Sequence, residues 1–157
     1  MKKQKGFSLI ELLIVVAIIL IIASMAIPNL LRARMSANEA SAVGAVRTLN
    51  AAEISYNSAY PTVGYAATLG ALSGTACSPP SATSACLIDT QLASGAKNGY
   101  TYAITATGEP VSTYSIIASP AVPNQTGVRY FCSFADAVVR YAESAITNCD
   151  GSITPLQ

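Results

Sequence analysis

Histidine and tryptophan are both absent from this sequence of 157 residues, and charged residues make up only 11% of it. Without histidine, no Ser-His or Cys-His catalytic dyad can form, and the commonest metal ligand is missing. Acidic residues occur singly, with no obvious carboxylate pair, and no glycine-rich phosphate loop is visible. We therefore expect no catalytic residues, no enzyme activity, no cofactor-binding residues and no metal site.

Positive charge is also scarce beyond the first five residues. Three of the nine Lys and Arg residues lie there, so the rest of the chain has six against eight Asp and Glu, a net charge of −2. These six are scattered singly and form no patch of the kind that binds a phosphate backbone. We expect no nucleic-acid partner.

The sequence does contain one long apolar run, residues 9–27, which is interrupted only by Glu11 and Ser24. Its length is about 19 residues, close to the ~20 that a helix needs to cross a bilayer core. Three lysines precede the run, and positive charge of this kind stays on the cytoplasmic side. We expect one membrane-spanning helix with its N terminus in the cytoplasm.

Glu11 does not fit an ordinary membrane helix, because an unpaired carboxylate in lipid costs on the order of a few kcal/mol. A cut between Gly6 and Phe7 would create an α-ammonium at Phe7, four residues before Glu11. Buried charges in proteins are paired. Packing of subunits into a filament would bury this amine and the carboxylate together.

Two simpler interpretations explain only part of the segment. A secretory signal would have a shorter apolar core, of about 7–15 residues, before a cleavage site such as Ser24-Met25-Ala26. It would not contain Glu11. A plain membrane anchor explains the length of the run but neither the Gly6-Phe7 pair nor the carboxylate.

The segment Gly6-Phe7-Ser8-Leu9-Ile10-Glu11-Leu12, with lysines before it and Pro28 after it, resembles the class III signal of type IV pilins and type II secretion pseudopilins. The resemblance is strong over roughly the first 55 residues and architectural beyond them. It implies that a prepilin peptidase cuts between Gly6 and Phe7 and that Phe7 is then N-methylated. It also implies that Glu11 guides assembly.

Residue pattern and resemblance together predict an α+β, type IV pilin-like fold. A long N-terminal helix should run from Phe7 to about Ser58 or Ala59, with a kink at Pro28. Its hydrophobic half would form the membrane or filament core, and its amphipathic half would pack on a roughly four-stranded antiparallel sheet. The expected parts are a leader (1–6), the core helix (7–28), the amphipathic half (29–60) and a globular head (61–157) with an αβ-loop, the sheet and a disulfide-bonded C-terminal region.

The amphipathic half has an apolar stripe at spacings of three and four residues, made of Ala45, Leu49, Ala52, Tyr56 and Ala59. The polar residues of this half lie largely off the stripe: Arg47, Asn50, Glu53 and Asn57. Residues 62–85 are rich in small and turn-forming residues, which indicates a surface connection. A short helix over residues 90–93 should be capped by Asp89 and ended by Gly95.

Strands are predicted at residues 100–107, 112–119, 128–134 and 137–141, from alternating or short apolar runs between turn residues. Asn98-Gly99 forms the turn before the first strand, and Asp136 lies in the turn before the last one. Short sequential connections imply an antiparallel meander. Residues 143–157 are expected to be loop-like.

Four cysteines follow the membrane segment and therefore lie outside the cytoplasm, where disulfides persist. Three pairings are possible. We favour Cys77–Cys86 and Cys132–Cys149, because each closes a short local loop. The second pair also resembles the C-terminal disulfide loop of many type IV pilins. Zinc is disfavoured, because the spacings are not those of a Cys-x-x-Cys pair.

Two weaker motifs have ordinary structural interpretations. Asp136, Glu143 and Asp150 could in principle help to bind calcium, as acidic loops do in some pseudopilins. The order of oxygen donors does not form a recognisable calcium loop, so turn formation explains them better. Asn124-Gln125-Thr126 matches a glycosylation sequon, but so short a match is common by chance, and we interpret it as a loop.

The predicted function is that of a major-pilin-like structural subunit of a type IV pilus. The resemblance implies four partners: further copies of the chain, the prepilin peptidase, an assembly ATPase with its platform proteins, and the bacterial inner membrane. A single-pass subunit with a periplasmic head would become part of an extracellular pilus. The alternatives are a pseudopilin of a type II secretion system and a minor pilin that acts as an adhesin or in DNA uptake.

Overall fold

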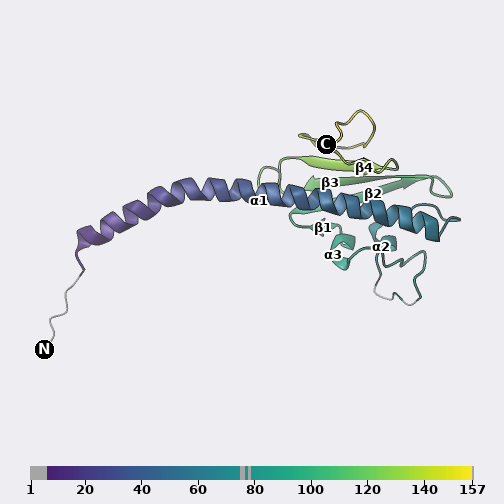
Figure 1. Cartoon of the computed structure of the whole chain (residues 1–157), viewed down its shortest axis with the longest axis horizontal. Helices are drawn as coiled ribbons and strands as arrows, with labels where there is room; N and C mark the ends of the chain where they lie inside the picture. The colour runs from purple at the N-terminus through teal and green to yellow at the C-terminus, as the bar shows by residue number, and fades with distance from the viewer. Residues whose placement is uncertain (1–6, 75–76, 78, 157) are drawn as a thin grey trace. The chain divides into compact units, whose positions relative to one another are not determined.

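The computed structural model describes residues 7–74, 77 and 79–156, and the chain divides into two units, Met1–Arg34 and Met35–Gln157. One helix, α1 (Leu9–Ala59), contributes residues to both units (Figure 1). The second unit is called the head. The predicted α+β architecture is confirmed, since the head part of α1 packs on an antiparallel sheet.

The described part of the first unit consists of the N-terminal part of α1, which begins at Leu9 rather than at the expected Phe7. Ser8 precedes the helix, and the backbone N–H of Leu12 donates to its carbonyl oxygen over 3.3 Å. The helix continues through Pro28. By length and composition, α1 is able to cross a membrane through this apolar part.

The head contains a five-stranded sheet in the order β1-β2-β3-β4-β5, and all its neighbouring strands are antiparallel. The strands are β1 (Ala96–Lys97), β2 (Tyr100–Thr107), β3 (Thr113–Pro120), β4 (Tyr130–Phe134) and β5 (Arg140–Ala142). Two short helices, α2 (Leu69–Leu72) and α3 (Thr90–Ala93), lie between α1 and the sheet in sequence. The order is the predicted meander with one additional strand.

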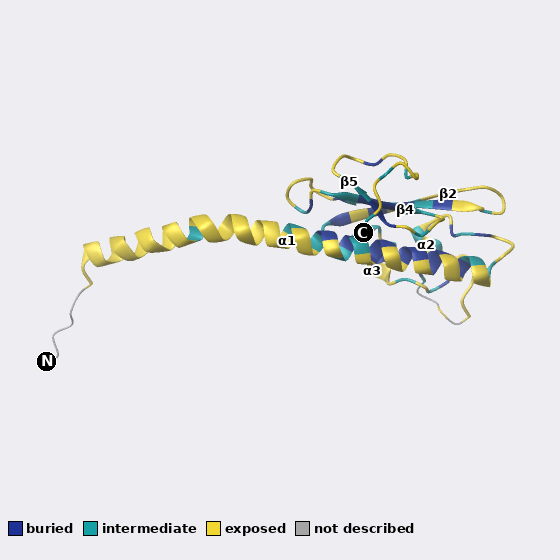
Figure 2. Ribbon diagram, turned by 45° about the horizontal axis from the view of Figure 1, so that its top comes forward, coloured by how far each residue is buried: buried dark blue, intermediate teal, exposed yellow. Residues whose placement is uncertain are grey.

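Alternation along β2 and β3 decides which face of the sheet meets α1. In β3, Tyr114, Ile116 and Ala118 are buried, and their neighbours in sequence are more exposed. In β2, Tyr100 and Tyr102 are buried on the same side. These side chains form one core with α1 residues Ala42, Ala45, Val46, Leu49, Ala52 and Tyr56. Figure 2 shows the buried residues of α1 within its head part only.

Several expected boundaries were wrong. The sheet has five strands rather than about four, because Ala96–Lys97 forms a two-residue strand across the Asn98-Gly99 turn. The strand expected over 128–134 begins at Tyr130, since the N–H groups of Val128 and Arg129 donate to the Glu39 carboxylate. The strand expected over 137–141 begins at Arg140, after a turn with Ala137 at φ 58°.

The connection over residues 62–85 is more than a surface segment. It contains α2, whose Leu72 is fully buried, and Ala66 is buried as well. Thr68 caps this helix by accepting from the N–H of Ala71. The connection therefore covers one side of the core, which explains why α1 has a wider buried face than a single apolar stripe provides.

The helix α3 agrees with its prediction at both ends. Asp89 Oδ1 accepts from the N–H of Leu92 over 2.6 Å, as an N-cap does. Gly95 follows the helix with φ 78°, a conformation that glycine adopts without steric cost. Lys97 of β1 then pairs with Asp89 over 2.7 Å.

Candidate assembly segment and its anchoring in the head

Glu11 caps the start of α1. Its Oε2 accepts from the backbone N–H of Ser8 over 2.9 Å, an arrangement in which the third residue of a helix satisfies the N–H of the capping residue. The positive end of the helix dipole also favours a carboxylate at this position. No described residue donates to Oε1, so this oxygen is open to a donor from outside the unit. Phe7 directly precedes this cap, and Gly6 lies outside the described residues.

The apolar part of α1 exposes its side chains on every face. Leu9 and Phe7 are both 80% exposed, and the large apolar side chains from Ile10 to Ile27 are 46% to 69% exposed. Ser24 satisfies its hydroxyl within the helix by donating to the carbonyl of Ile21 over 2.8 Å. A helix that is apolar all round requires lipid or other apolar helices around it. The segment therefore fits a bilayer or a bundle of its own copies.

Pro28 lies inside α1, just after this apolar run. A proline has no N–H to donate, so the carbonyl four residues earlier, at Ser24, loses its usual helical partner. This missing bond is a local weak point in the helix. The kink predicted at Pro28 remains a prediction.

The head end of α1 is tied to the sheet by Glu39. Its carboxylate accepts from the N–H groups of Val128 (2.8 Å) and Arg129 (3.1 Å), and from Nε of Arg129 (2.8 Å). Burial alone would raise the pKa of Glu39. The two backbone donors and the guanidinium outweigh it and hold the pKa of this carboxyl below its usual value. Glu39 is therefore an ionised residue whose two carboxylate oxygens both accept hydrogen bonds from the sheet side of the head.

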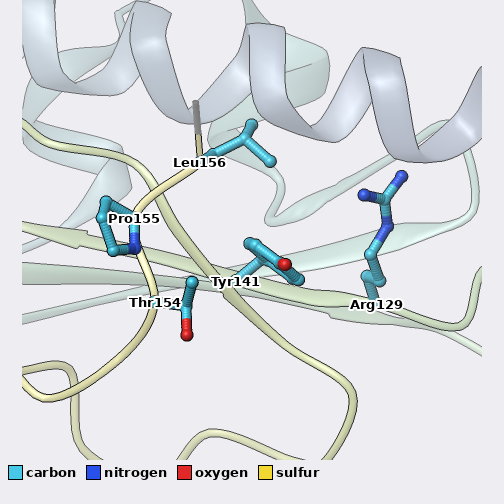
Figure 3. A pocket seen from close by; sticks show the side chains of 5 residues that line it. All are labelled: Arg129, Tyr141, Thr154, Pro155 and Leu156. Atoms are coloured by element: carbon cyan, nitrogen blue, oxygen red, sulfur yellow. The ribbon is translucent and has the colours of Figure 1, made fainter.

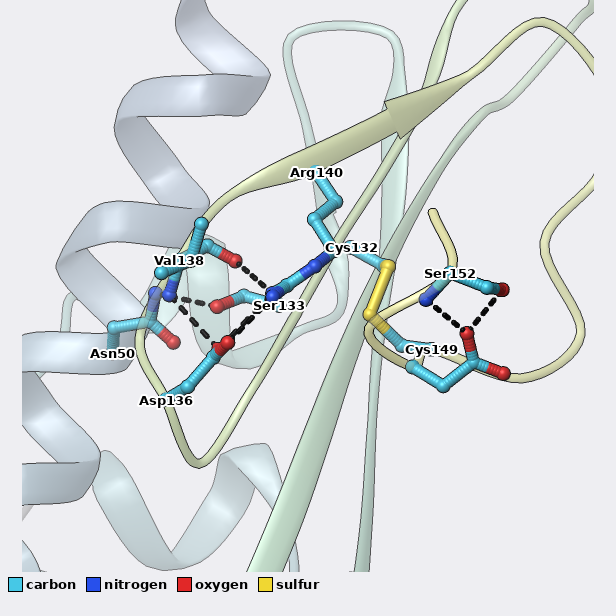
Figure 4. Close-up of a disulfide and its surroundings, with 9 residues drawn as sticks. Asn50, Cys132, Ser133, Asp136, Val138, Arg140, Cys149 and Ser152 are labelled. Carbon is cyan, nitrogen blue, oxygen red and sulfur yellow. Dashed lines mark hydrogen bonds and ion pairs between the residues drawn. A yellow bond between two sulfur atoms is a disulfide. The ribbon is translucent and has the colours of Figure 1, made fainter. Parts of the chain in front are cut away.

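Asn50 forms a second tie, farther along α1. Its Nδ2 donates to Oγ of Ser133 (2.9 Å) and to the carbonyl of Ala137 (3.3 Å), and its Oδ1 accepts from the hydroxyl of Tyr114 (3.2 Å). Figure 4 shows Asn50 facing Ser133 beside the Cys132–Cys149 disulfide. The amide links α1 to both β3 and β4.

Glu53 forms a third tie, of a different kind. The residue is 0% exposed, and its Oε2 accepts from the N–H of Ala66 over 2.8 Å. Oε1 is buried without a hydrogen-bond partner among the described residues. Burial raises the pKa of Glu53 to about 7, and the Ala66 bond offsets only part of this effect. Glu53 therefore changes charge near neutral pH.

The two polar ties in the middle of α1 were not predicted from the sequence, in which Asn50 and Glu53 lie largely off the expected apolar stripe. Both are buried, Asn50 at 4% exposed and Glu53 at 0%. A signal for Glu53 was present, because Leu49, Glu53 and Tyr56 are spaced four and three residues apart. Conversely, Ala59 was placed on the stripe and is exposed at the end of the helix.

The cysteines form two disulfides in the structure. Cys77 is bonded to Cys86 and Cys132 to Cys149, with Cα–Cα distances of 5.7 and 5.9 Å. The first closes part of the connection after α1, and the second ties the C-terminal segment to β4. These are the two pairs that the spacing favoured.

The acidic residues considered for calcium have other partners. Asp136 pairs with Arg140 over 2.6 Å, and Asp150 accepts from the N–H and hydroxyl of Ser152 (Figure 4). Arg140 also lies over the ring of Phe134, at 4.4 Å from its centroid. Over residues 7–74, 77 and 79–156, no three His, Cys, Asp or Glu side chains gather in a way that could hold a metal ion.

The N-terminal residues match known proteins. Residues 1–27 match the prokaryotic N-terminal methylation motif. The chain is 64% identical over 39 residues to the type IV wide pilus major component PilA4 of Thermus thermophilus, which covers 25% of this chain and 30% of that protein. It is 43% identical over 65 residues to the type II secretion system core protein G of Vibrio cholerae, which covers 40% of this chain and 44% of that protein.

The chain thus spans less than half the length of each of these relatives, and no solved structure gives a significant match. The structure defines a class of protein in which an exposed apolar helix continues into an α+β head. Residues 1–27 carry the N-terminal methylation motif, and the two relatives are a type IV pilus component and a type II secretion protein, which agrees with the resemblance found at Gly6 to Leu12. Both relatives are structural proteins rather than enzymes.

Proposed function

We propose that this protein is a structural subunit of a type IV pilus, and that it polymerises through the N-terminal part of α1 after a prepilin peptidase cuts between Gly6 and Phe7. The observation that carries the proposal is the helix segment before Pro28, which is exposed and apolar on all faces and begins with a carboxylate, Glu11, that caps the helix. The relative that is 64% identical over 39 residues is a major component of a pilus.

The chemistry of assembly follows from the position of Glu11. Its Oε2 is held by the N–H of Ser8, and Oε1 is open to a donor. The cut makes Phe7 the N-terminal residue. Its methylated amine is a small cation, which can form an ion pair with a carboxylate. In a filament the Phe7 amine of one subunit and Glu11 of a neighbour are buried as a pair, which removes the cost of an isolated charge in an apolar medium.

The apolar residues let the helix leave the membrane at little cost in free energy. Lipid and a bundle of identical helices are both apolar, so transfer from membrane to filament leaves residues 9–27 in an equivalent environment. An assembly ATPase and its platform then supply the directed work. The subunit waits in the bacterial inner membrane with a periplasmic head and ends in an extracellular pilus, where disulfides such as Cys132–Cys149 persist.

A pseudopilin of a type II secretion system is the second candidate. The match to core protein G covers 65 residues, a longer stretch than the match to the pilus component. This function would use the same segment in a short periplasmic filament. A minor pilin acting in adhesion or DNA uptake is a third candidate, although the head has few basic residues.

Electron microscopy of sheared surface filaments, with identification of the subunit by mass spectrometry, distinguishes a pilus from a periplasmic filament. We expect the wild-type subunit to begin with methylated Phe7 and a Gly6→Leu variant to keep its leader. A wild-type chain that still begins with Met1 would refute processing at this bond.

The role of Glu11 is tested by co-expressing a Glu11→Ala variant with the wild-type chain. We expect normal processing but no incorporation into filaments, because the variant offers no carboxylate to a neighbouring amine. Glu11→Asp is the matched control that keeps the charge on a shorter side chain, and we expect partial incorporation. Normal incorporation of the alanine variant would contradict the charge-pairing mechanism.

A further inference from the structure

The two ends of the head differ in structure. At one end, where the head part of α1 begins, Asn38 Nδ2 donates to the carbonyl of Thr126 over 2.9 Å, and Asn98 Nδ2 donates to Oγ of Ser41 over 2.6 Å. At the other end, the turn between β2 and β3 lies beside the end of α1, because Val111 exchanges hydrogen bonds with Val63 and Tyr65. Figure 1 shows this turn at the end of the head where α1 stops.

The charged residues of the described chain fall into two groups. Lys97, Arg129 and Arg140 each pair with a carboxylate of the head. The cations without an ion-pair partner among residues 7–74, 77 and 79–156 are all on α1: Arg32, Arg34 and Arg47. Three exposed carboxylates of the head, Glu109, Glu143 and Asp150, likewise have no ion-pair partner within that part of the chain. Asp150 already accepts two hydrogen bonds from Ser152, whereas Glu109 and Glu143 lie in loops beside the sheet.

A groove at the first end of the head gathers positive charge over an apolar floor. Its volume is about 330 Å³, and its lining includes Arg47, Arg129, Val43, Phe131 and Leu156; we name it the arginine groove. It continues past Arg129 and Leu156 into a hollow of about 450 Å³ beside Tyr141, shown in Figure 3.

Arg129 is held in a position that leaves part of its guanidinium free. Its Nε is used by Glu39, while its two terminal nitrogens donate to no described residue. The guanidinium carbon lies 5.8 Å from the ring centroids of both Phe131 and Tyr141, and the side chain is 41% exposed. Because Glu39 offsets only one of the two charges, the arginine groove keeps one net positive charge from Arg47.

We propose that the arginine groove of one subunit binds the Gly108-Glu109-Pro110 turn of a second copy of this chain, with Glu109 paired to Arg47 and to the free nitrogens of Arg129. The inference rests on the proposed polymerisation. An open helical filament requires each subunit to present two different, complementary patches. The groove and the turn lie at opposite ends of the head and carry opposite charge, and the exposed ring of Pro110 suits the apolar floor.

Glu143 does not meet this requirement. It follows Ala142, which pairs with Tyr130 directly after Arg129, so it lies at the same end of the head as the groove. A contact between like ends of two subunits would be isologous and would close a dimer rather than extend a filament. Glu143 is therefore a matched control with the same charge and a similar exposure.

Charge reversal in the full chain tests the proposal. In a host that assembles wild-type filaments, we expect Arg47→Glu to lower the ratio of sheared filament to membrane-held subunit by about fivefold, the factor that about 1 kcal/mol per contact produces. Adding Glu109→Arg should restore the ratio, whereas adding Glu143→Arg, with the same net charge, should not. Unchanged levels of membrane-held subunit and its resistance to protease show that the head still folds.

A second measurement does not depend on filament yield. Filaments carrying Arg47→Cys and Glu109→Cys together should form disulfide-linked ladders on non-reducing gels, and Arg47→Cys with Glu143→Cys should not. Normal assembly of Arg47→Glu, equal rescue by Glu143→Arg, or no ladder from the first cysteine pair in intact filaments would each overturn the inference. Absence of wild-type filaments would instead refute the proposed function on which the inference rests.

Discussion

Glu53 makes the stability of the head depend on pH in an unusual direction. Its carboxyl is fully buried, and burial raises its pKa from an ordinary value of 4.5 to about 7. An acid whose pKa is higher in the folded state stabilises that state when protonated. The contribution is therefore complete below pH 4.5 and is lost as the pH rises toward 7.

The size of the effect follows from the difference between the two pKa values. Each pKa unit corresponds to 1.36 kcal/mol, so a rise from 4.5 to about 7 amounts to about 3 kcal/mol between acid and neutral pH. The pKa of the other anchoring carboxyl, Glu39, is lowered, so its contribution has the opposite sign and does not add to a loss of stability as the pH rises. Histidine is absent from the chain, so no imidazole titrates between pH 5 and 8.

The assay is urea unfolding of the detergent-solubilised full chain, followed by near-UV circular dichroism of its tyrosines. We expect the free energy of unfolding of the wild-type head to fall by about 2–3 kcal/mol from pH 5 to pH 8, because part of the contribution is already lost between pH 4.5 and pH 5. Glu53→Gln keeps an acceptor for the Ala66 N–H but cannot ionise, so its stability should be nearly constant over this range. It should exceed that of the wild type at pH 8.

The amine at the N terminus titrates near pH 8, and the comparison of the two chains removes its contribution. A wild-type stability that does not change between pH 5 and 8 would refute the burial argument. An equal fall in Glu53→Gln would assign the pH dependence to another group.

Two further predictions concern the packing of the head. Leu49→Ala should lower the free energy of unfolding by about 2–5 kcal/mol, because Leu49 is fully buried between α1 and the sheet, and urea unfolding would measure it; a loss below 1 kcal/mol would contradict that packing. Replacing Cys132 and Cys149 together by serine should lower the free energy of unfolding by about 2–4 kcal/mol and make the C-terminal segment sensitive to protease. Unchanged digestion would show that the hydrogen bonds of residues 139–141 to residues 154 and 156 are enough to hold this segment without the disulfide.

The sequence predicted best those elements whose signals are local. Asp89 caps α3 through a bond to a residue three positions on, and β2 alternates between buried and exposed residues along its own length. β1 was missed because two residues cannot show a period. Its pairing exists only through the turn at Asn98-Gly99. The short α2 was missed for the same reason, since its single buried side chain, Leu72, sets no pattern.

The polar anchors escaped sequence reasoning for a different reason. A glutamate or asparagine on a helix is ordinarily exposed, and only a partner far away in sequence makes its burial favourable. Glu39 finds its donors about 90 residues later, and Asn50 finds Ser133 83 residues later. The apolar N-terminal part of α1 needed no such information, because length, apolarity and the position of Glu11 are all properties of one continuous stretch.

The polar anchors fix the position of α1 along the sheet, which the apolar stripe alone does not do. Four of the buried residues of α1 that face the sheet are alanine or valine, Ala42, Ala45, Val46 and Ala52, and a helix with so uniform a surface could shift along the sheet at little cost. Each polar tie is satisfied at one position only: Glu39 at Val128 and Arg129, Asn50 at Ser133, and Glu53 at Ala66. A shift by one turn would leave all three buried without their partners, at a cost of about 1–3 kcal/mol for each neutral group and more for a charged one. In the proposed polymerisation, a pull on α1 would reach the head only through this fixed register, because otherwise the helix would slide along the sheet before it transmitted force.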